Sequence, residues 1–179
     1  MATTPNELFA FLDRLGIVHA TVTHAPLFTL EQSQALRGTI PGGHTKNLFL
    51  KDKKDAVFLV VAPEDARVDL KTLHHRLGAG RFSFGSAALL EELLGVSPGA
   101  VTAFGAINDT SARVNVVLDA GLMHQPTINC HPLVNTMTTS VARDDLVKFL
   151  QATGHVPRIE QVADPAGQAP ADRLQSDAP

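Results

Sequence analysis

The sequence predicts a single compact α+β domain with a mixed, mostly antiparallel β-sheet and flanking helices. Hydrophobic residues make up 44% of the 179-residue chain, which suffices for one buried core. Apolar, β-rich runs are interspersed with segments of helical periodicity and helix caps. These strands and helices do not follow the regular βαβ order that is typical of a parallel sheet. The three observations together favour the α+β class.

The first helix is predicted from its N-terminal signals. Thr4 is the cap, Pro5 takes the first helical position, and Glu7 completes a capping box with Thr4. Gly16 is predicted to end the helix. Residues 17–24 then alternate as a strand would.

The next part of the chain predicts a helix and a hairpin. A second capping box, completed by Gln32, indicates a helix over residues 29–36. Two β-rich runs at 46–51 and 56–61 flank the polar stretch 52–55. Such a pattern is typical of a β-hairpin.

The rest of the body is predicted as short elements. Helices are expected over 69–77 and 86–94, each followed by a glycine that can close it. Strands are expected over 113–118 and 136–141, and a last helix over 144–153.

The chain divides into a body and a tail. Residues 1–156 form the predicted domain. Residues 157–179 are rich in Pro and Ala and have no apolar period, so we expect a flexible C-terminal tail or a segment laid loosely over the domain.

Charge and hydropathy limit the classes of partner. The net charge is −3, whereas a protein that binds duplex DNA without sequence preference is strongly basic. Residues 46–81, however, carry eight basic residues against five acids. These basic residues could contact a few phosphates of an RNA. The alternative is that they are the solvated edge of a hairpin. The longest apolar runs, such as 56–62, fall far short of the roughly 18 residues that span a membrane. With no signal-peptide pattern, we expect a cytoplasmic protein without membrane contact.

Several standard catalytic sites are absent from the sequence. It has no Walker A loop and no Gly-x-Gly-x-x-Gly fingerprint. None of the eight histidines forms a His-Glu-x-x-His motif, so we expect no metal. The one cysteine, Cys130, is expected to be a small buried thiol rather than a nucleophile.

Three polar clusters interrupt apolar strands, where polar groups carry a desolvation cost. In the first, residues 42–50, Lys46 could bind a ligand that is anionic or carries a carbonyl group. The alternative is that Lys46 is an ordinary lysine at the edge of a strand. In the second, residues 97–109, Gly105 would allow backbone N–H groups to face a substrate oxygen. The alternative is that this segment is a plain turn. The third, residues 128–140, suits either the wall of a polar pocket or a Thr-rich edge strand.

Taken together, the three clusters resemble a known family. Thr-Lys-Asn-Leu-Phe-Leu stands at 45–50, and Pro-Gly-Ala-Val-Thr-Ala-Phe-Gly at 98–105, followed by Ile-Asn-Asp at 107–109. Asn-Cys-His-Pro-Leu-Val-Asn-Thr stands at 129–136. These motifs, in this order, resemble the YbaK-like aminoacyl-tRNA deacylases, which include the editing domain of bacterial prolyl-tRNA synthetases. The sequence is most similar to the free-standing branch that removes alanine from mischarged tRNA-Pro. The resemblance covers about residues 5–153, and Ala103 stands where the family commonly has proline.

The resemblance implies a fold and a reaction. The fold is an α+β domain whose mixed sheet forms a partial barrel with a cleft. The reaction is hydrolysis of the ester between an amino acid and the 3′-terminal adenosine of tRNA. It uses no metal, cofactor or protein nucleophile: a positioned water attacks, and the tetrahedral oxyanion is stabilised. The 2′-hydroxyl of the adenosine is thought to orient or activate that water.

The resemblance also implies roles for individual residues. Lys46 would contact the terminal nucleotide or the ester carbonyl, and Gly105 with its neighbours would supply backbone donors to the oxyanion. The substrate-binding residues would be Asn47, Phe104, His131, Asn135 and Thr138. The implied partner is the acceptor end of a mischarged tRNA, with transient contact to prolyl-tRNA synthetase or an elongation factor.

Two alternatives stay open at this point. The first is a deacylase for tRNA mischarged with another amino acid, such as cysteine or serine. The second is a module that binds an acceptor end without catalysis, although binding alone would not need Lys46 at the pocket.

Overall fold

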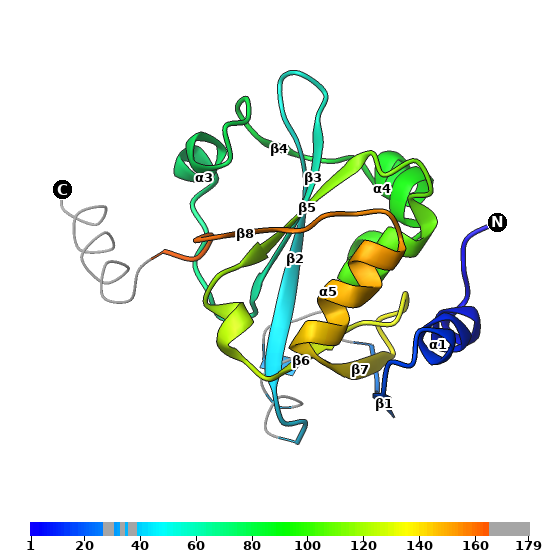
Figure 1. The fold of residues 1–179 in the computed structure, drawn as a ribbon. Helices are drawn as coiled ribbons and strands as arrows, with labels where there is room; N and C mark the ends of the chain where they lie inside the picture. The colour runs from blue at the N-terminus through cyan, green and yellow to red at the C-terminus, as the bar shows by residue number, and fades with distance from the viewer. Residues whose placement is uncertain (27–30, 33–34, 36–38, 165–179) are drawn as a thin grey trace.

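The computed structural model describes residues 1–26, 31–32, 35 and 39–164. The described residues form a mixed eight-stranded sheet with helices around it (Figure 1). Its strands are β1 (His19–Thr23), β2 (Gly43–Lys51), β3 (Val57–Pro63), β4 (Ser83–Phe84), β5 (Val114–Asp119), β6 (Thr127–Cys130), β7 (Met137–Ala142) and β8 (Arg158–Glu160). The helices are α1 (Pro5–Arg14), α3 (Leu70–Arg76), α4 (Ala87–Leu94) and α5 (Arg143–Ala152), with 3₁₀ turns η1 (Pro98–Ala100), η2 (Ala103–Asn108) and η3 (Leu122–His124).

The strand order confirms the predicted fold class. Strands run β1-β7-β6-β2-β3-β5-β8, and β4 pairs with β2 off this path. The pairs β2–β6, β3–β5 and β5–β8 are parallel. The pairs β1–β7, β2–β3, β2–β4 and β6–β7 are antiparallel. The sheet is therefore mixed, as expected for an α+β domain that lacks regular crossovers.

Local signals explain the elements that were predicted well. The Thr4 hydroxyl accepts a hydrogen bond from the Glu7 N–H at 3.2 Å, and the Glu7 carboxylate accepts one from the Thr4 N–H at 2.7 Å. This capping box confirms the predicted start of α1. Gly16 follows the helix with a φ of +72°, which a residue with a Cβ rarely adopts. The helix expected over 29–36 lies largely outside the described residues.

The β2–β3 hairpin is confirmed, and its turn is held by one carboxylate. Asp52 accepts hydrogen bonds from the N–H groups of Lys54 and Ala56, each at 2.9 Å, and of Gly80 at 3.0 Å. These bonds, the one from Gly80 first, lower the pKa of Asp52. The same side chain therefore shapes the turn and fastens it to the chain at residue 80.

β3 is buried on both faces, because its apolar run packs against a different layer on each side. Val57, Leu59 and Val61 belong to the larger core, together with residues of α1, α4 and α5. Phe58, Val60 and Ala62 belong to the smaller core, whose members include Leu73 of α3. In Figure 1, α3 and α4 lie on either side of the hairpin and α5 crosses in front of the sheet. No helix among the described residues is long and apolar enough to cross a membrane.

The folded domain extends beyond the boundary expected after residue 156. β8 pairs in parallel with β5, and Val162 is buried in the smaller core. The buried carboxylate of Asp119 accepts hydrogen bonds from Val162 N–H and Ala163 N–H, both at 2.9 Å. The sequence showed no sign of this strand because β8 has only three residues and pairs with a distant partner. The rest of the expected tail, residues 165–179, lies outside the described residues.

These contacts predict that residues 157–164 stabilise the domain. A chain that ends at residue 156 loses the buried Val162 side chain and leaves the Asp119 carboxylate without two of its donors. Each loss costs about 1–3 kcal/mol. We expect urea unfolding to give a free energy of unfolding lower by about 3 kcal/mol or more. A chain that ends at residue 164 is the matched control, and equal stability of the two truncated chains would contradict the assignment.

Candidate functional site

The alternation of β2 places the two residues of its Lys-Asn pair on opposite sides of the sheet. Leu48 and Leu50 pack with the smaller core, so Lys46 lies on that side. Phe49 packs with the larger core, so Asn47 lies on the other side. The resemblance placed both in one substrate site, but the strand does not present them to the same face.

Lys46 is half-buried at the start of β2, opposite Ala62 of β3. Its ammonium group donates a hydrogen bond to the carbonyl of Ala66. Burial lowers the pKa of Lys46, and the nearby Asp65 carboxylate partly offsets that effect. A lysine ammonium has three donors, and the contact with Ala66 uses one of them. The group is thus a positioned cation that retains donors for an anionic or carbonyl-bearing ligand.

His131 lies close to Thr138 through an intermediate histidine. The Nε2 atom of His24 lies 2.8 Å from the Thr138 hydroxyl, and the rings of His24 and His131 are 6.3 Å apart. Thr138 is buried, whereas both histidines are partly exposed. The structure therefore brings two of the predicted substrate-binding residues into one polar cluster, which we call the histidine cluster: His24, His131 and Thr138.

The protonation of His131 follows from its surroundings. Its Nδ1 atom lies 2.9 Å from the carbonyl oxygen of Met137, which can only accept, so Nδ1 carries the proton. Burial lowers the pKa of His131, and the Met137 carbonyl partly offsets this effect. The ring is therefore neutral at pH 7, and its Nε2 atom is a hydrogen-bond acceptor.

Glu64 and His44 extend this polar region toward Lys46. The charges of both residues act on the pKa of His131, Glu64 raising it and His44 lowering it. The Glu64 N–H donates to the His44 carbonyl at 2.9 Å, which ties the end of β3 to the start of β2. A hollow of about 190 Å³ opens here, and His44 and Asp65 line it. Polar groups from β2, from the residues directly after β3 and from the loop after β6 therefore influence one another at one end of the sheet.

Asn47 lies at a second cavity. That cavity has a volume of about 270 Å³ and is lined mainly by apolar side chains, among them Phe49, Pro98 and Val101. The amide oxygen of Asn47 is buried and has no hydrogen-bond partner among the described residues. A buried polar atom without a partner costs free energy unless a ligand or water satisfies it. Asn47 is thus placed to bind a ligand, but not beside Lys46.

Phe104 and Gly105, which were expected in the substrate site, are both buried. Phe104 is fully buried and packs edge-on against Phe149, with ring centroids 5.2 Å apart. The Gly105 N–H donates to the Thr102 carbonyl at 3.1 Å, so it is not available to an oxyanion. A Cβ at position 105 would lie 3.0 Å from the Cβ of Leu94, which shows that this glycine allows close packing against α4. Both residues serve the core.

Asn135 and Cys130 complete the third motif. Asn135 is partly buried, and its amide nitrogen lies 3.3 Å from where a Cβ on Gly99 would be, so it borders the loop that carries η1. Cys130 is buried, and burial raises the pKa of its thiol to about 12. A thiol with that pKa is not a nucleophile at neutral pH.

Sequence reasoning missed His24, His44 and Glu64 as neighbours of the site. Glu64 offered a signal, since it is a charged residue directly after a fully apolar strand. His44 stands in the first polar cluster, residues 42–50, two residues before Lys46. His24 offered no signal, because only the folded sheet brings it beside Thr138. Among the described residues, no three His, Cys, Asp or Glu side chains form a group that could hold a metal ion.

Comparisons with known proteins show the family to which the chain is related. The family model of the aminoacyl-tRNA editing domain matches residues 24–149. The chain is 41% identical over 155 residues to "Prolyl-tRNA synthetase associated domain-containing protein 1" of Danio rerio, covering 86% of this chain and 84% of that protein. It is 36% identical over 149 residues to "Prolyl-tRNA editing protein ProX" of Acetoanaerobium sticklandii, covering 83% and 91%.

The fold is also found in solved structures. A crystal structure described as a candidate trans-editing enzyme for prolyl-tRNA synthetase superposes with a TM-score of 0.68. The match covers 92% of this chain and all (100%) of that one at 17% sequence identity, so it supports the fold alone.

The burial of Cys130 predicts an unreactive thiol. Because its pKa is raised to about 12, the thiolate fraction at pH 8 is far below that of an exposed cysteine, whose pKa is about 8.5. We expect the native protein to react with a disulfide reagent at least about 100-fold more slowly than the protein unfolded in urea. Absorbance of the released thiolate measures the rate. Rapid stoichiometric labelling of the native protein would contradict the assignment.

Proposed function

The chain belongs to the aminoacyl-tRNA editing domain family and is an aminoacyl-tRNA deacylase, and we propose that its substrate is tRNA-Pro mischarged with alanine. The observation that carries the proposal is the placement of Lys46, a half-buried cation at the start of β2. It lies two residues after His44 on the same strand, and the charges of His44 and Glu64 both act on His131.

An activated ester needs little chemical assistance from the protein. Water attacks the carbonyl carbon, the carbonyl oxygen becomes negative, and the ester bond to the 3′-oxygen then breaks as that oxygen takes up a proton. A fixed cation close to the developing oxyanion stabilises it, and bound geometry removes the entropy cost of bringing water and ester together. Lys46 is assigned this position, either on the ester carbonyl or on the phosphate of the terminal nucleotide.

The histidine cluster is assigned to the aminoacyl end of the substrate. The neutral His131 ring offers an acceptor at Nε2, which suits the ammonium group of an amino acid or the attacking water. Thr138 is oriented by its hydrogen bond with His24. A pocket that fits alanine excludes proline sterically. A site rejects a larger side chain by steric exclusion more strongly than it rejects a smaller one by the loss of contacts.

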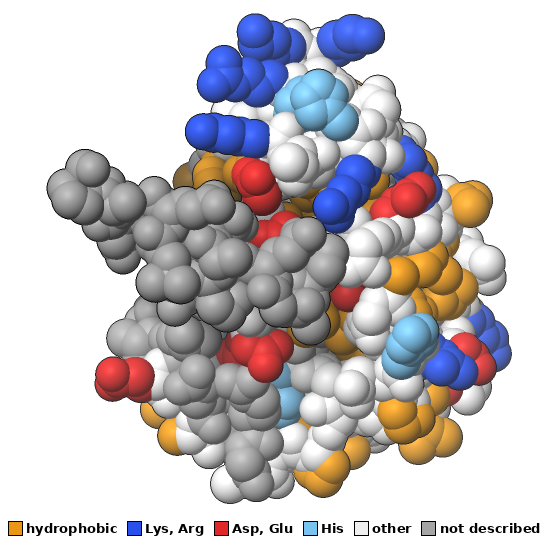
Figure 2. Space-filling view, turned by 90° about the vertical axis from the view of Figure 1, so that its left-hand side faces the viewer, with side chains coloured by type: hydrophobic (Ala, Val, Ile, Leu, Met, Phe, Trp, Pro, Cys, Tyr) orange, Lys and Arg blue, Asp and Glu red, His pale blue; other side chains and the backbone are white. Residues whose placement is uncertain are grey.

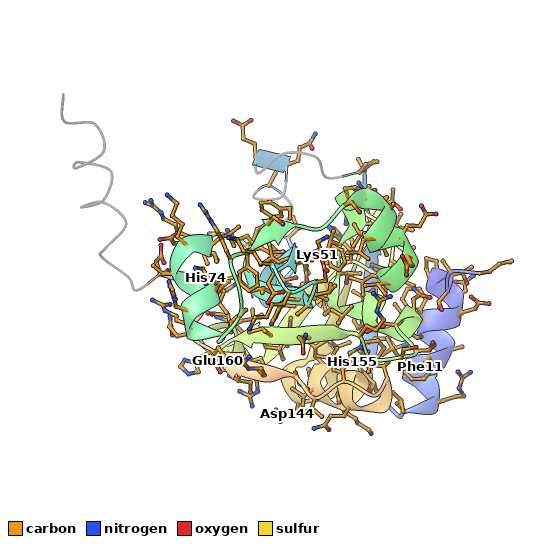
Figure 3. The ribbon with its side chains drawn as sticks, turned by 90° about the horizontal axis from the view of Figure 1, so that it is seen from above. Phe11, Lys51, His74, Asp144, His155 and Glu160 are labelled. Carbon is orange, nitrogen blue, oxygen red and sulfur yellow. The ribbon has the colours of Figure 1, made fainter. Side chains whose placement is uncertain are left out.

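The tRNA body is assigned to the basic turn, which we define as Lys51, Lys53 and Lys54. Lys53 and Lys54 are exposed, and Asp52 fixes the turn from inside. Figure 2 shows Lys and Arg side chains gathered at the end of the molecule where the β2–β3 turn lies. In the view from above, Lys51 lies between α3 and α4 (Figure 3). Three lysines suit a few phosphates and therefore a weak contact.

The first functional prediction concerns specificity and Lys46. We expect the purified protein to release alanine from Ala-tRNA-Pro and to leave Pro-tRNA-Pro intact. Lys46→Ala should lower kcat/KM by about 100-fold or more, the usual loss when one stabilising contact to an oxyanion is removed. Release of labelled amino acid from Ala-, Pro-, Cys- and Ser-charged tRNA-Pro measures both effects.

The controls separate catalysis from folding and binding. Lys71→Ala on α3 removes an exposed lysine of equal charge and should leave the rate unchanged. Hydrolysis of Cys- or Ser-tRNA-Pro in preference to Ala-tRNA-Pro would identify a different amino acid as the substrate. Binding of tRNA without hydrolysis of any charged form would make the protein a binding module and refute the proposal.

The second functional prediction concerns the basic turn. Replacing Lys51, Lys53 and Lys54 together by alanine should raise KM several-fold and change kcat little, because phosphate contacts away from the ester bind ground and transition states equally. The wild-type salt dependence should be shallow, with a log–log slope of roughly −2 to −4, and the triple variant should be shallower still. Steady-state kinetics at two salt concentrations measure both quantities. Lys148→Ala on α5 is the control, and an unchanged KM in the triple variant would show that the turn is only a solvated edge.

A further inference from the structure

Phe84 is an aromatic side chain that the proposed reaction has not used. All nine aromatic residues of the chain are phenylalanines. Among those whose burial the structure describes, only Phe84 is largely exposed, with 66% of its surface accessible. A single exposed apolar residue needs no explanation by itself. What distinguishes Phe84 is the fixed backbone that carries it and the cavity that it borders.

The backbone around Phe84 is held firmly. β4 pairs with the end of β2, with Phe84 opposite Leu50, and the Gly85 N–H donates to the Phe49 carbonyl at 2.9 Å. A Cβ at position 85 would lie 2.5 Å from the ring of Phe49, so only glycine fits there without a shift. The exposed ring therefore stands on a fixed strand beside a packed aromatic residue, and not on a loose loop.

Phe84 also forms one wall of the cavity that holds Asn47. The remaining walls are largely apolar, with Phe49, Leu90, Pro98 and Val101 among them. The buried oxygen of Asn47 without a partner is the polar feature that points to a ligand. An apolar cavity of about 270 Å³ with one hydrogen-bonding amide and a flat aromatic rim suits a flat heterocycle that carries polar edges.

The position along β2 indicates where such a heterocycle would come from. Lys51, at the end of β2, belongs to the basic turn, and Lys46 lies near the start of the strand. Phe84 pairs opposite Leu50, between these two lysines. A single strand of nucleic acid that bound both the basic turn and Lys46 would therefore pass close to this ring. Cationic side chains combined with an aromatic stacking surface are the usual means of binding single-stranded nucleic acid.

We propose that Phe84 stacks on a base of the single-stranded 3′ end of the tRNA and that the adjoining cavity receives part of that nucleotide. This inference rests on the proposed function, since it assumes that an aminoacylated RNA end reaches Lys46. Phe84 is thereby a positioning residue that fixes the path of the RNA between the phosphate contacts and the ester. Stacking of one base on an aromatic ring is sensitive to alanine substitution and tolerant of base identity.

The test combines protein variants with altered RNA. Phe84→Ala should raise KM for Ala-tRNA-Pro about tenfold and leave kcat within about twofold, the size of effect expected for one stacked base. Phe84→Trp should restore the wild-type KM because it keeps a flat ring, whereas Phe84→Leu should behave like Phe84→Ala. Ile159→Ala on β8 is the matched control, since Ile159 is an exposed apolar residue on a different strand and is 54% accessible.

A second readout identifies the stacked nucleotide. Uncharged acceptor-stem RNA hairpins are used as competitive inhibitors, with an abasic nucleotide at one position of the single-stranded 3′ end at a time. At one position, the abasic hairpin should bind the wild-type protein about tenfold more weakly than the unmodified hairpin does. The same abasic hairpin should bind wild type and Phe84→Ala equally well, because the base that stacks on Phe84 is already missing. A purely structural role of Phe84 would weaken binding of every hairpin to the same extent.

The outcomes separate this inference from the proposed function. If wild type does not hydrolyse Ala-tRNA-Pro, the proposed function fails before the variants are compared. If wild type is active and Phe84→Ala has the same KM and inhibition constants, the stacking inference is wrong and the proposed function stands. If Phe84→Ala instead changes the oligomeric state in size-exclusion chromatography and leaves RNA binding unaltered, the ring covers a second copy of the chain, and the inference is again wrong.

Discussion

The arrangement of the site depends on the register of β2. This strand pairs with β3 from Thr45 to Lys51, with β6 at its start and with β4 at its end. A shift of one residue would exchange the faces of Lys46 and Asn47 and expose apolar side chains that now lie in the two cores. Because both faces of β3 are buried, such a shift is costly, and the register is strongly specified. Core packing therefore fixes the strand that carries the cation and the buried amide, and the hydrogen bond to Ala66 then orients the cation.

The same packing keeps the one cysteine of the chain unreactive. Cys130 stands within the third motif, but it packs in the larger core, and burial suppresses its ionisation. Lys46 and His131 are only partly buried, at the end of the sheet where β2, β3 and the loop after β6 meet. Burial lowers the pKa of both, which leaves the histidine neutral while the lysine still offers donors. An activated ester needs little more than positioning and charge, and this arrangement suits that requirement.

The sequence predicted the parts of the fold that have local signals. The α1 capping box, the hairpin and the glycine after α4 each depend on a few neighbouring residues, and all three are present. β4 and β8 are too short to show a pattern and form only through pairing with distant strands. In the site, the alternation of side chains along a strand is by itself enough to place Lys46 and Asn47 on opposite faces of β2. The burial of Phe104 and Gly105 could not be predicted, because both stand in a motif whose polar neighbours suggest a pocket.

The proposed geometry places the ester beside Lys46 at the start of β2, with the 3′ end of the RNA running along that strand. Its most direct test is a crystal structure of the protein with an acceptor-stem RNA whose terminal adenosine carries alanine through a stable 3′-amide. We predict the amide carbonyl or the terminal phosphate within about 3 Å of the Lys46 ammonium, a hydrogen-bonding distance. An alanyl group bound away from Lys46 and His131, with the ammonium still directed only to Ala66, would contradict the account.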